Sequence, residues 1–249
     1  MTSLDKLRIK IFADGADYDH IVRVAVHPLV RGFTTNPMLL HRAGVSDYEG
    51  FARRVLAAVP DRPISFEVIA DDFAGMVREA HIVAAWGANV NVKIPVTNGK
   101  GEFSGPVIAE LAAAGVALNI TAVMTHDQIR RIVDVLPPKA RAMVSVFAGR
   151  IADTGRDPVP YLAECVKLLG ARPNAELIWA SPRELLNVFQ ADAIGCHIIT
   201  VGTDLLAKLP LVGKDLAAYS LETVSMFIRE AAAAGLVIGS DTGKRRGVA

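Results

Sequence analysis

Eight short apolar or β-branched runs recur along the chain, and segments with helical periodicity separate each run from the next. Runs of four to six such residues are typical of buried strands. The separating segments place apolar residues three and four positions apart, as in Phe73, Met76, Val77 and Ala80, which predicts amphipathic helices. The expected strands are Arg8–Phe12, Gly32–Thr35, Ile64–Ile69, Val90–Pro95, Ala117–Thr121, Met143–Phe147, Leu177–Ala180 and His197–Val201.

This alternation, repeated without a composition break or a long linker, predicts one α/β domain over residues 1–249 that folds as a (β/α)8 TIM barrel. A doubly wound open sheet is the structural alternative, but it normally carries a glycine-rich phosphate turn after its first strand. Residues 13–17, Ala-Asp-Gly-Ala-Asp, are not such a turn. Beyond the eighth unit we expect a helix over about residues 215–235 that packs on the barrel or on a neighbouring subunit, and a frayed tail over residues 240–249.

Local capping residues mark several helix boundaries. Thr125, Asp157 and Ser181 each precede a helical segment, and their side chains are of the type that caps a helix N-terminus. Gly115 and Gly170 follow helical segments and are typical of helix ends. We therefore expect helices to begin just after Thr125, Asp157 and Ser181, and to end at Gly115 and Gly170.

The composition argues against two classes of binding partner, nucleic acids and membranes. The chain of 249 residues has a formal net charge of +1 and only 6% aromatic residues, which argues against a nucleic-acid surface. No uncharged apolar run reaches about 18 residues, so we expect no membrane span. The start of the sequence lacks an apolar signal-peptide region, and Cys165 and Cys196 show no metal-ligand spacing. These features favour a cytoplasmic protein with reduced thiols and no bound metal.

A lysine inside the fourth run points to a functional site. Successive strand side chains face opposite sides, so with Val90, Val92 and Ile94 packed under the helices, Lys93 faces the barrel interior. The other strands also place polar residues at inward positions near their C-terminal ends, where barrel enzymes build their active sites. A structural ion pair of Lys93, or satisfied core polar groups, is the alternative explanation. The inward polar set is Asp14, Asn36, Glu67, Lys93, Asn119, Thr121 and Ser145.

Two further segments are suited to binding an anion. Arg150 follows the sixth run, and Ser181 and Arg183 follow the seventh at the expected helix start. Two guanidinium groups, a hydroxyl and a helix N-terminus together favour a phosphate dianion. The alternative is that both arginines are solvated loop residues, which is less favoured because they flank the same end of the expected barrel.

Five strings, in this order on consecutive strands, resemble the transaldolase family, whose short-chain branch also holds the fructose-6-phosphate aldolases. The resemblance extends from Asp14 to the helix after the eighth run. It implies a barrel enzyme of sugar metabolism such as the pentose phosphate pathway, with sugar phosphate substrates, no cofactor and a homo-oligomeric state. The strings are Gly32-Phe-Thr-Thr-Asn-Pro37, Val92-Lys-Ile-Pro-Val-Thr97, Asn119-Ile-Thr121, Ser145-Val-Phe-Ala-Gly-Arg-Ile151 and Ala180-Ser-Pro-Arg183.

The resemblance assigns the catalytic roles. Lys93 matches the lysine that forms a Schiff base with the C2 carbonyl of a ketose, and burial in an apolar strand favours the neutral amine that this chemistry needs. Asp14 matches the base that removes the C4 hydroxyl proton. Glu67 and Thr121 match the pair that handles the catalytic water. Substrate-binding roles, holding the dihydroxyacetone unit or clamping a phosphate, are expected for Thr35, Asn36, Asn119, Ser145, Phe147, Arg150, Ser181 and Arg183.

Three positions favour the transaldolase branch, since Glu67, Phe147 and Arg183 stand where fructose-6-phosphate aldolases have glutamine, tyrosine and lysine. Pro182 and the Ala13-Asp14-Gly15 string depart from the family pattern. The function expected is transfer of a dihydroxyacetone unit from a ketose phosphate to an aldehyde. The alternatives are an aldolase that releases free dihydroxyacetone, a transaldolase with a non-standard substrate, a metal-dependent barrel enzyme and a non-catalytic sugar-phosphate-binding barrel.

Overall fold

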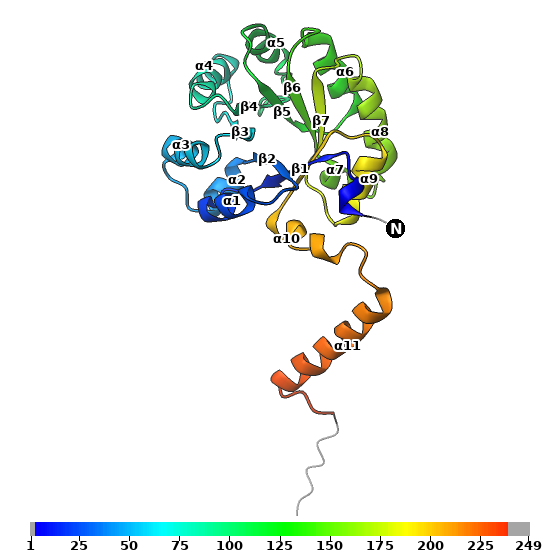
Figure 1. The fold of residues 1–249 in the computed structure, drawn as a ribbon. Coiled ribbons are helices and arrows are strands. Elements are labelled where there is room, and N and C mark those ends of the chain that lie inside the picture. The colour runs from blue at the N-terminus through cyan, green and yellow to red at the C-terminus, as the bar shows by residue number, and fades with distance from the viewer. Residues whose placement is uncertain (1–2, 239–249) are drawn as a thin grey trace, which may run out of the picture. The chain divides into compact units, whose positions relative to one another are not determined.

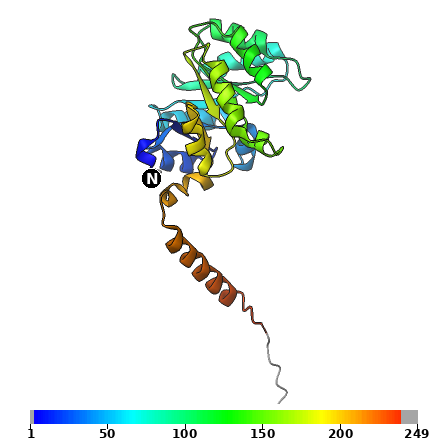
Figure 2. The same cartoon turned by 90° about the vertical axis from the view of Figure 1, so that its right-hand side faces the viewer.

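The computed structural model describes residues 3–238, and within them the strands form a closed parallel barrel. Each strand pairs with the next along the chain, and β8 pairs with β1 to close the ring. Figure 1 shows the helices outside this ring, and Figure 2 shows the same arrangement from the side. The strands are β1 (Lys10–Asp14), β2 (Val30–Thr34), β3 (Ile64–Glu67), β4 (Val90–Pro95), β5 (Leu118–Val123), β6 (Ala142–Val146), β7 (Ala175–Trp179) and β8 (Ile198–Val201).

The predicted (β/α)8 barrel is confirmed, and the eight expected runs coincide with the eight strands to within a few residues. The helices are α1 (Tyr18–Ala25), α2 (Pro37–Arg42), α3 (Tyr48–Ala58), α4 (Phe73–Ala84), α5 (Gly105–Ala113), α6 (His126–Val135), α7 (Ala148–Ala152), α8 (Pro158–Leu169), α9 (Leu186–Ala193), α10 (Thr203–Leu206) and α11 (Leu216–Ala233), with 3-10 turns η1 (Leu4–Lys6) and η2 (Leu209–Leu211).

Two of the three expected helix starts are correct and one is wrong, and α5 and α8 end at or just before the expected Gly115 and Gly170. Thr125 caps α6 in a capping box with Gln128, and the Asp157 side chain caps α8. Ser181 does not begin a helix, because α9 starts only at Leu186. The physical reason is local: Ser181 has a positive φ of 56°, whereas an N-cap residue is extended, and Asn187 Oδ1 accepts from the Arg183 and Glu184 N–H groups in its place.

Apolar side chains fill the middle of the barrel interior. Phe12, Met143, Ile178 and Ile198 form a buried cluster from β1, β6, β7 and β8. Gly32 on β2 makes room for it, since a Cβ at this position would lie 2.5 Å from the Phe12 ring. The apolar cluster closes the middle of the barrel, so that polar side chains nearer the strand C-termini have an apolar floor.

The chain divides into two compact units, and the barrel with its covering helices lies within residues 5–210. The second unit holds α11, which the Asp215 side chain caps and which covers most of the helix expected over residues 215–235. No residue of α11 is buried, and Leu216, Leu221 and Phe227 are among its exposed apolar side chains. Its packing partner therefore stays a prediction, and the expected frayed tail over residues 240–249 lies outside the described residues.

No helix among residues 3–238 is long and apolar enough to cross a membrane.

Candidate active site

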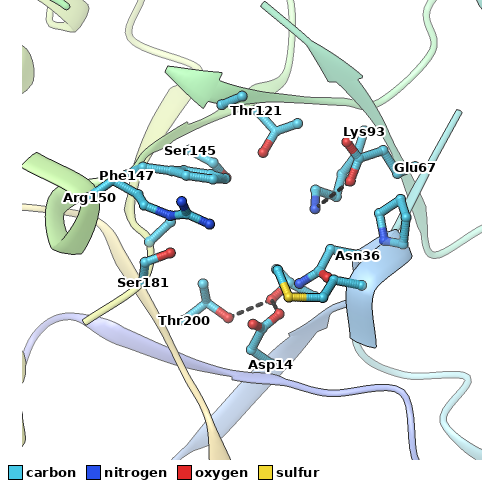
Figure 3. A pocket seen from close by; sticks show the side chains of 15 residues that line it. Asp14, Asn36, Glu67, Lys93, Thr121, Ser145, Phe147, Arg150, Ser181 and Thr200 are labelled. Carbon is cyan, nitrogen blue, oxygen red and sulfur yellow. Dashed lines mark hydrogen bonds and ion pairs between the residues drawn. The ribbon is translucent and has the colours of Figure 1, made fainter. Parts of the chain in front are cut away.

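A cavity of about 270 Å³ opens at the C-terminal ends of the strands, where the sequence predicts the site. Figure 3 shows that side chains from most of the strands converge on it. Residues expected from the sequence form much of its wall, together with residues that the sequence analysis did not select. The principal lining residues are Asp14, Thr34, Asn36, Met38, Glu67, Lys93, Thr121, Ser145, Phe147, Arg150, Ser181 and Thr200.

Lys93 lies at the base of the cavity, and its side chain is only 7% exposed. The register pairs Lys93 on β4 with Glu67 on β3, so the two side chains leave neighbouring strands at the same height. The Lys93 Nζ lies 3.0 Å from Glu67 Oε2 and donates a hydrogen bond of 2.7 Å to the carbonyl oxygen of Thr35. An ammonium group carries three donors, and these two acceptors compensate part of the cost of its burial.

Asp14 reaches the same cavity from the end of β1. Its Oδ1 accepts a hydrogen bond of 2.6 Å from Thr34 Oγ1, which in turn lies 2.6 Å from Thr200 Oγ1. Burial raises the pKa of Asp14 above its usual value; the Thr34 hydrogen bond and the charge of Lys93 oppose this shift, and Glu67 adds to it. A carboxyl group whose two protonation states are brought closer in energy is suited to general acid–base chemistry.

Thr34 and Thr200 are the polar lining residues that the sequence analysis missed. In the β2 run, alternation places Thr34 on the same face as Asn36, which was already expected to point inward, so the rule would have found it. The structure shows that Thr34 faces the cavity. In the β8 run, Thr200 stands between Ile199 and Val201, so the alternation rule applied to the other strands would have found it.

Thr121 presents a free hydroxyl to the cavity. Its Oγ1 is buried and, among the described residues, has no hydrogen-bond partner. The next residue, Ala122, has a positive φ of 60°, and the β5–β6 register shifts between Ile120 and Val123. Buried hydroxyl groups are nearly always bonded, so this orphaned group fits the binding of a water molecule or a substrate atom.

Two residues expected to bind substrate lie behind the cavity wall. Asn119 is fully buried, accepts a hydrogen bond of 2.7 Å from Ser145 Oγ and donates one of 3.0 Å to Ser65 Oγ. The Thr35 side chain donates to the carbonyl oxygen of Ser65, so only the Thr35 carbonyl reaches Lys93. Ser145 and Asn36 do line the cavity, as expected.

The expected anion site is only partly assembled. Arg150 on α7 and Ser181 both line the cavity. Gly149 allows their segments to approach, since a Cβ there would lie 1.7 Å from the Ser181 carbonyl oxygen. Arg183 is not among the lining residues: its side chain is 48% exposed, and its Nε donates to Asp153 Oδ1 at 3.0 Å. The Arg150–Arg183 pair predicted from the sequence is therefore not formed in this structure.

The described residues contain no group of three or more histidine, cysteine, aspartate or glutamate side chains arranged to hold a metal ion. Asp14 and Glu67 are the two carboxylates that line the cavity; Glu67 pairs with the Lys93 ammonium, and burial raises the pKa of Asp14, which the Lys93 charge opposes. The ionisable part of the site therefore consists of an amine and two carboxyl groups in one cavity, with an arginine at the rim.

The chain is similar to known proteins over most of its length. A family model described as "Transaldolase/Fructose-6-phosphate aldolase" matches residues 11–239. A "Probable transaldolase" of Dehalococcoides mccartyi is 31% identical, over 88% of this chain and 99% of the relative. A "Probable transaldolase 2" of Listeria monocytogenes is 34% identical, over 85% of this chain and 94% of the relative. A dihydrodipicolinate synthase structure from Rhodopseudomonas palustris has a TM-score of 0.53 at 18% identity, covering 89% and 81% of the two chains, and supports the fold alone.

Fold and site together define a (β/α)8 barrel with a buried lysine at the C-terminal end of its strands. Within that class, the chain belongs to the transaldolase/fructose-6-phosphate aldolase family. It is an enzyme of this kind.

Proposed function

We propose that the protein is a class I transaldolase, which carries a dihydroxyacetone unit from a ketose to an aldehyde through a Schiff base on Lys93. The observation that carries this proposal is the Lys93 amine, buried at the base of a cavity, paired with Glu67 and sharing that cavity with Asp14. Such an arrangement supplies a nucleophile and a proton acceptor in one cavity, with the amine largely shielded from bulk water.

In the first half of the reaction, the neutral Lys93 Nζ attacks the C2 carbonyl carbon of the ketose. Glu67 returns the proton that Lys93 gave up to become neutral, the carbonyl oxygen leaves as water, and a protonated imine remains. Asp14 then takes the proton of the C4 hydroxyl, the C3–C4 bond breaks, and its electron pair moves into the imine to form an enamine. The shortened aldose leaves, and three carbons stay bound to Lys93.

In the second half, the enamine carbon attacks the carbonyl carbon of an acceptor aldehyde, and Asp14 returns its proton to the new alkoxide. Water then hydrolyses the imine and releases the new ketose. The unpaired Thr121 hydroxyl and the Glu67 carboxylate, which both line the cavity, support a role in holding that water. Ser145 and Asn36 hold the dihydroxyacetone unit through hydrogen bonds, and Asn119 positions Ser145 from behind the cavity wall.

Phe147 favours transfer over release. A phenyl ring in the wall provides no proton for the enamine carbon, so the enamine persists until an acceptor arrives. Arg150 and Ser181 at the rim support binding of an anionic group on the sugar, as in the sugar phosphates of pentose phosphate metabolism.

A sugar without a phosphate group is the second candidate substrate. The observation in its favour is that Arg183 pairs with Asp153, which leaves Arg150 as the arginine on the cavity wall. One guanidinium group with a hydroxyl is a weaker site for a dianion than two guanidinium groups.

The test is a product assay with a ketose phosphate donor, with and without an aldose phosphate acceptor. We expect a new ketose only when both are present, and no loss of activity in excess EDTA. Rapid release of free dihydroxyacetone without an acceptor would show an aldolase instead. Turnover only with unphosphorylated aldehydes would favour the second candidate.

A further inference from the structure

The hydrogen-bond ladder between β2 and β3 is interrupted beside Lys93. Phe33 pairs with Ile64 and Thr34 with Ser65, and the Thr35 N–H donates to the Ser65 carbonyl oxygen at 3.1 Å. In a regular parallel ladder, the next bond would run from the Glu67 N–H back to the Thr35 carbonyl oxygen. Here that oxygen instead accepts from the Lys93 Nζ at 2.7 Å. The β2–β3 ladder therefore lacks this backbone hydrogen bond, because Lys93 occupies its acceptor.

The Tyr48 hydroxyl takes the place of the missing partner. Its oxygen accepts a hydrogen bond of 2.8 Å from the Glu67 N–H and donates one of 3.1 Å to the Glu67 carbonyl oxygen. Both backbone groups of Glu67 on this side are therefore satisfied without Thr35. A buried N–H group left unpaired would compete for the nearest carbonyl oxygen, because unpaired buried backbone groups are strongly disfavoured.

The ring of Tyr48 is fixed by its surroundings. Tyr48 is the first residue of α3, and its ring contacts Phe66 and Trp86 edge-on, with centroid distances of 6.2 and 5.2 Å. Burial raises the pKa of Tyr48 above its usual value, so the hydroxyl keeps its proton and can donate and accept at once. The chain beyond Glu67 is also tethered, because Glu79 accepts from the backbone N–H groups of Ile69 and Ala70.

We propose that Tyr48 is a positioning residue for Lys93, since it fixes the Glu67 backbone and leaves the Thr35 carbonyl free to hold the Lys93 amine. Tyr48 is not among the residues that line the cavity, so it acts through these two partners of the lysine. This inference rests on the proposed function, because the amine that Tyr48 positions is the one that forms the Schiff base.

Tyr48→Phe tests the inference, since it removes the hydroxyl and keeps the ring. Tyr161→Phe is the matched control: Tyr161 lies on α8, stacks on His126, and among residues 3–238 its hydroxyl has no hydrogen bond. The rate of imine formation is measured by quenching with borohydride and quantifying the adduct on Lys93, alongside kcat, KM and the melting temperature. A misplaced nucleophile costs on the order of 10- to 100-fold in rate.

We expect Tyr48→Phe to lower the imine-formation rate and kcat by roughly 10- to 100-fold with KM nearly unchanged, and Tyr161→Phe to behave as the wild type. A Tyr48→Phe protein that remains folded at the assay temperature and traps at the wild-type rate would overturn the positioning role while leaving the proposed function standing. Absence of any adduct in the wild-type protein would overturn the proposed function itself, and this inference with it.

Discussion

Two lysine–glutamate pairs lie at opposite ends of the barrel strands, and they differ in burial more than in distance. Lys10 at the start of β1 contacts Glu176 on β7 at 2.6 Å, with side chains 49% and 31% exposed. Lys93 in β4 contacts Glu67 at 3.0 Å, with side chains 7% and 14% exposed. Exposed pairs contribute about 0–1 kcal/mol, whereas loss of one partner from a buried pair costs about 3–5 kcal/mol. The Lys93–Glu67 pair, although its contact is the longer one, should therefore matter more for stability.

The surroundings of the two pairs differ in the same direction as their burial. Lys10 and Glu176 line a cavity at the N-terminal end of the strands, together with Arg31 and Arg141. Lys93 and Glu67 share their cavity with Asp14 and the unpaired Thr121 hydroxyl. The first set is a charged, hydrated surface; the second is a desolvated group of reactive side chains. Each variant below is matched, where the chain allows, with its counterpart at the other end.

The largest effect is expected from Lys93→Ala. Loss of the nucleophile should lower kcat by on the order of 10⁴-fold or more, whereas Lys10→Ala should leave kcat near the wild-type value. Steady-state kinetics with donor and acceptor measures both. Lys93→Arg should also be inactive, because a guanidinium group stays protonated. Near-wild-type turnover of Lys93→Ala would make the buried pair merely structural.

Asp14→Asn should lower kcat by about 10²- to 10⁴-fold, since it removes the proposed base. The same substitution should raise the stability of the folded protein at neutral pH, although it lowers activity. Burial raises the Asp14 pKa above 3.8, so the folded protein binds this proton more tightly than the unfolded chain does, and stability falls as pH rises through that window. At neutral pH the variant should therefore melt at a higher temperature. Melting curves at several pH values check this, and a lower melting temperature at neutral pH would contradict it.

Glu67→Gln and Glu176→Gln compare the two pairs by stability. Removing the Glu67 carboxylate leaves Lys93 with the Thr35 carbonyl, and should lower the free energy of unfolding by about 3–5 kcal/mol. The same change at Glu176 should cost about 0–1 kcal/mol. Denaturant unfolding at one pH measures both values. Equal losses would show that burial does not distinguish the pairs.

Arg150→Ala is expected to have the smallest effect. A charge-assisted hydrogen bond contributes about 1.5–3 kcal/mol, so KM for a phosphorylated substrate should rise roughly 10- to 150-fold with a small change in kcat. Arg141→Ala, which removes an arginine from the opposite cavity, is the control and should leave KM unchanged. If KM responds to neither variant, the anion does not bind at the Arg150 rim.

The barrel and most of the cavity wall follow from local patterns in the sequence. Strand alternation places Lys93 and Glu67 inward, and it would have placed Thr200 there as well. Alternation is a property of one strand at a time, so it predicts direction but not depth. Asn119 points inward as predicted, yet Ser145 and Ser65 hold it behind the wall.

Features that depend on contacts between distant segments were not predictable. The pairing of Arg183 with Asp153 depends on how the loop after β7 meets the end of α7, and Ser181 in this loop has a backbone conformation that Pro182 alone does not specify. The Tyr48 hydrogen bonds to Glu67 join residues 19 positions apart, at the point where a strand ladder opens. Nothing in the periodicity around Tyr48 separates it from an ordinary apolar helix position.

Borohydride reduction in the presence of a ketose donor, followed by peptide mass mapping, tests the central claim most directly. We expect an adduct with the mass of a reduced substrate-derived imine on Lys93 and none on Lys10, and no adduct in Lys93→Ala. An active enzyme that forms no adduct on Lys93, or forms it equally on Lys10, would contradict the claim that the buried lysine is the nucleophile.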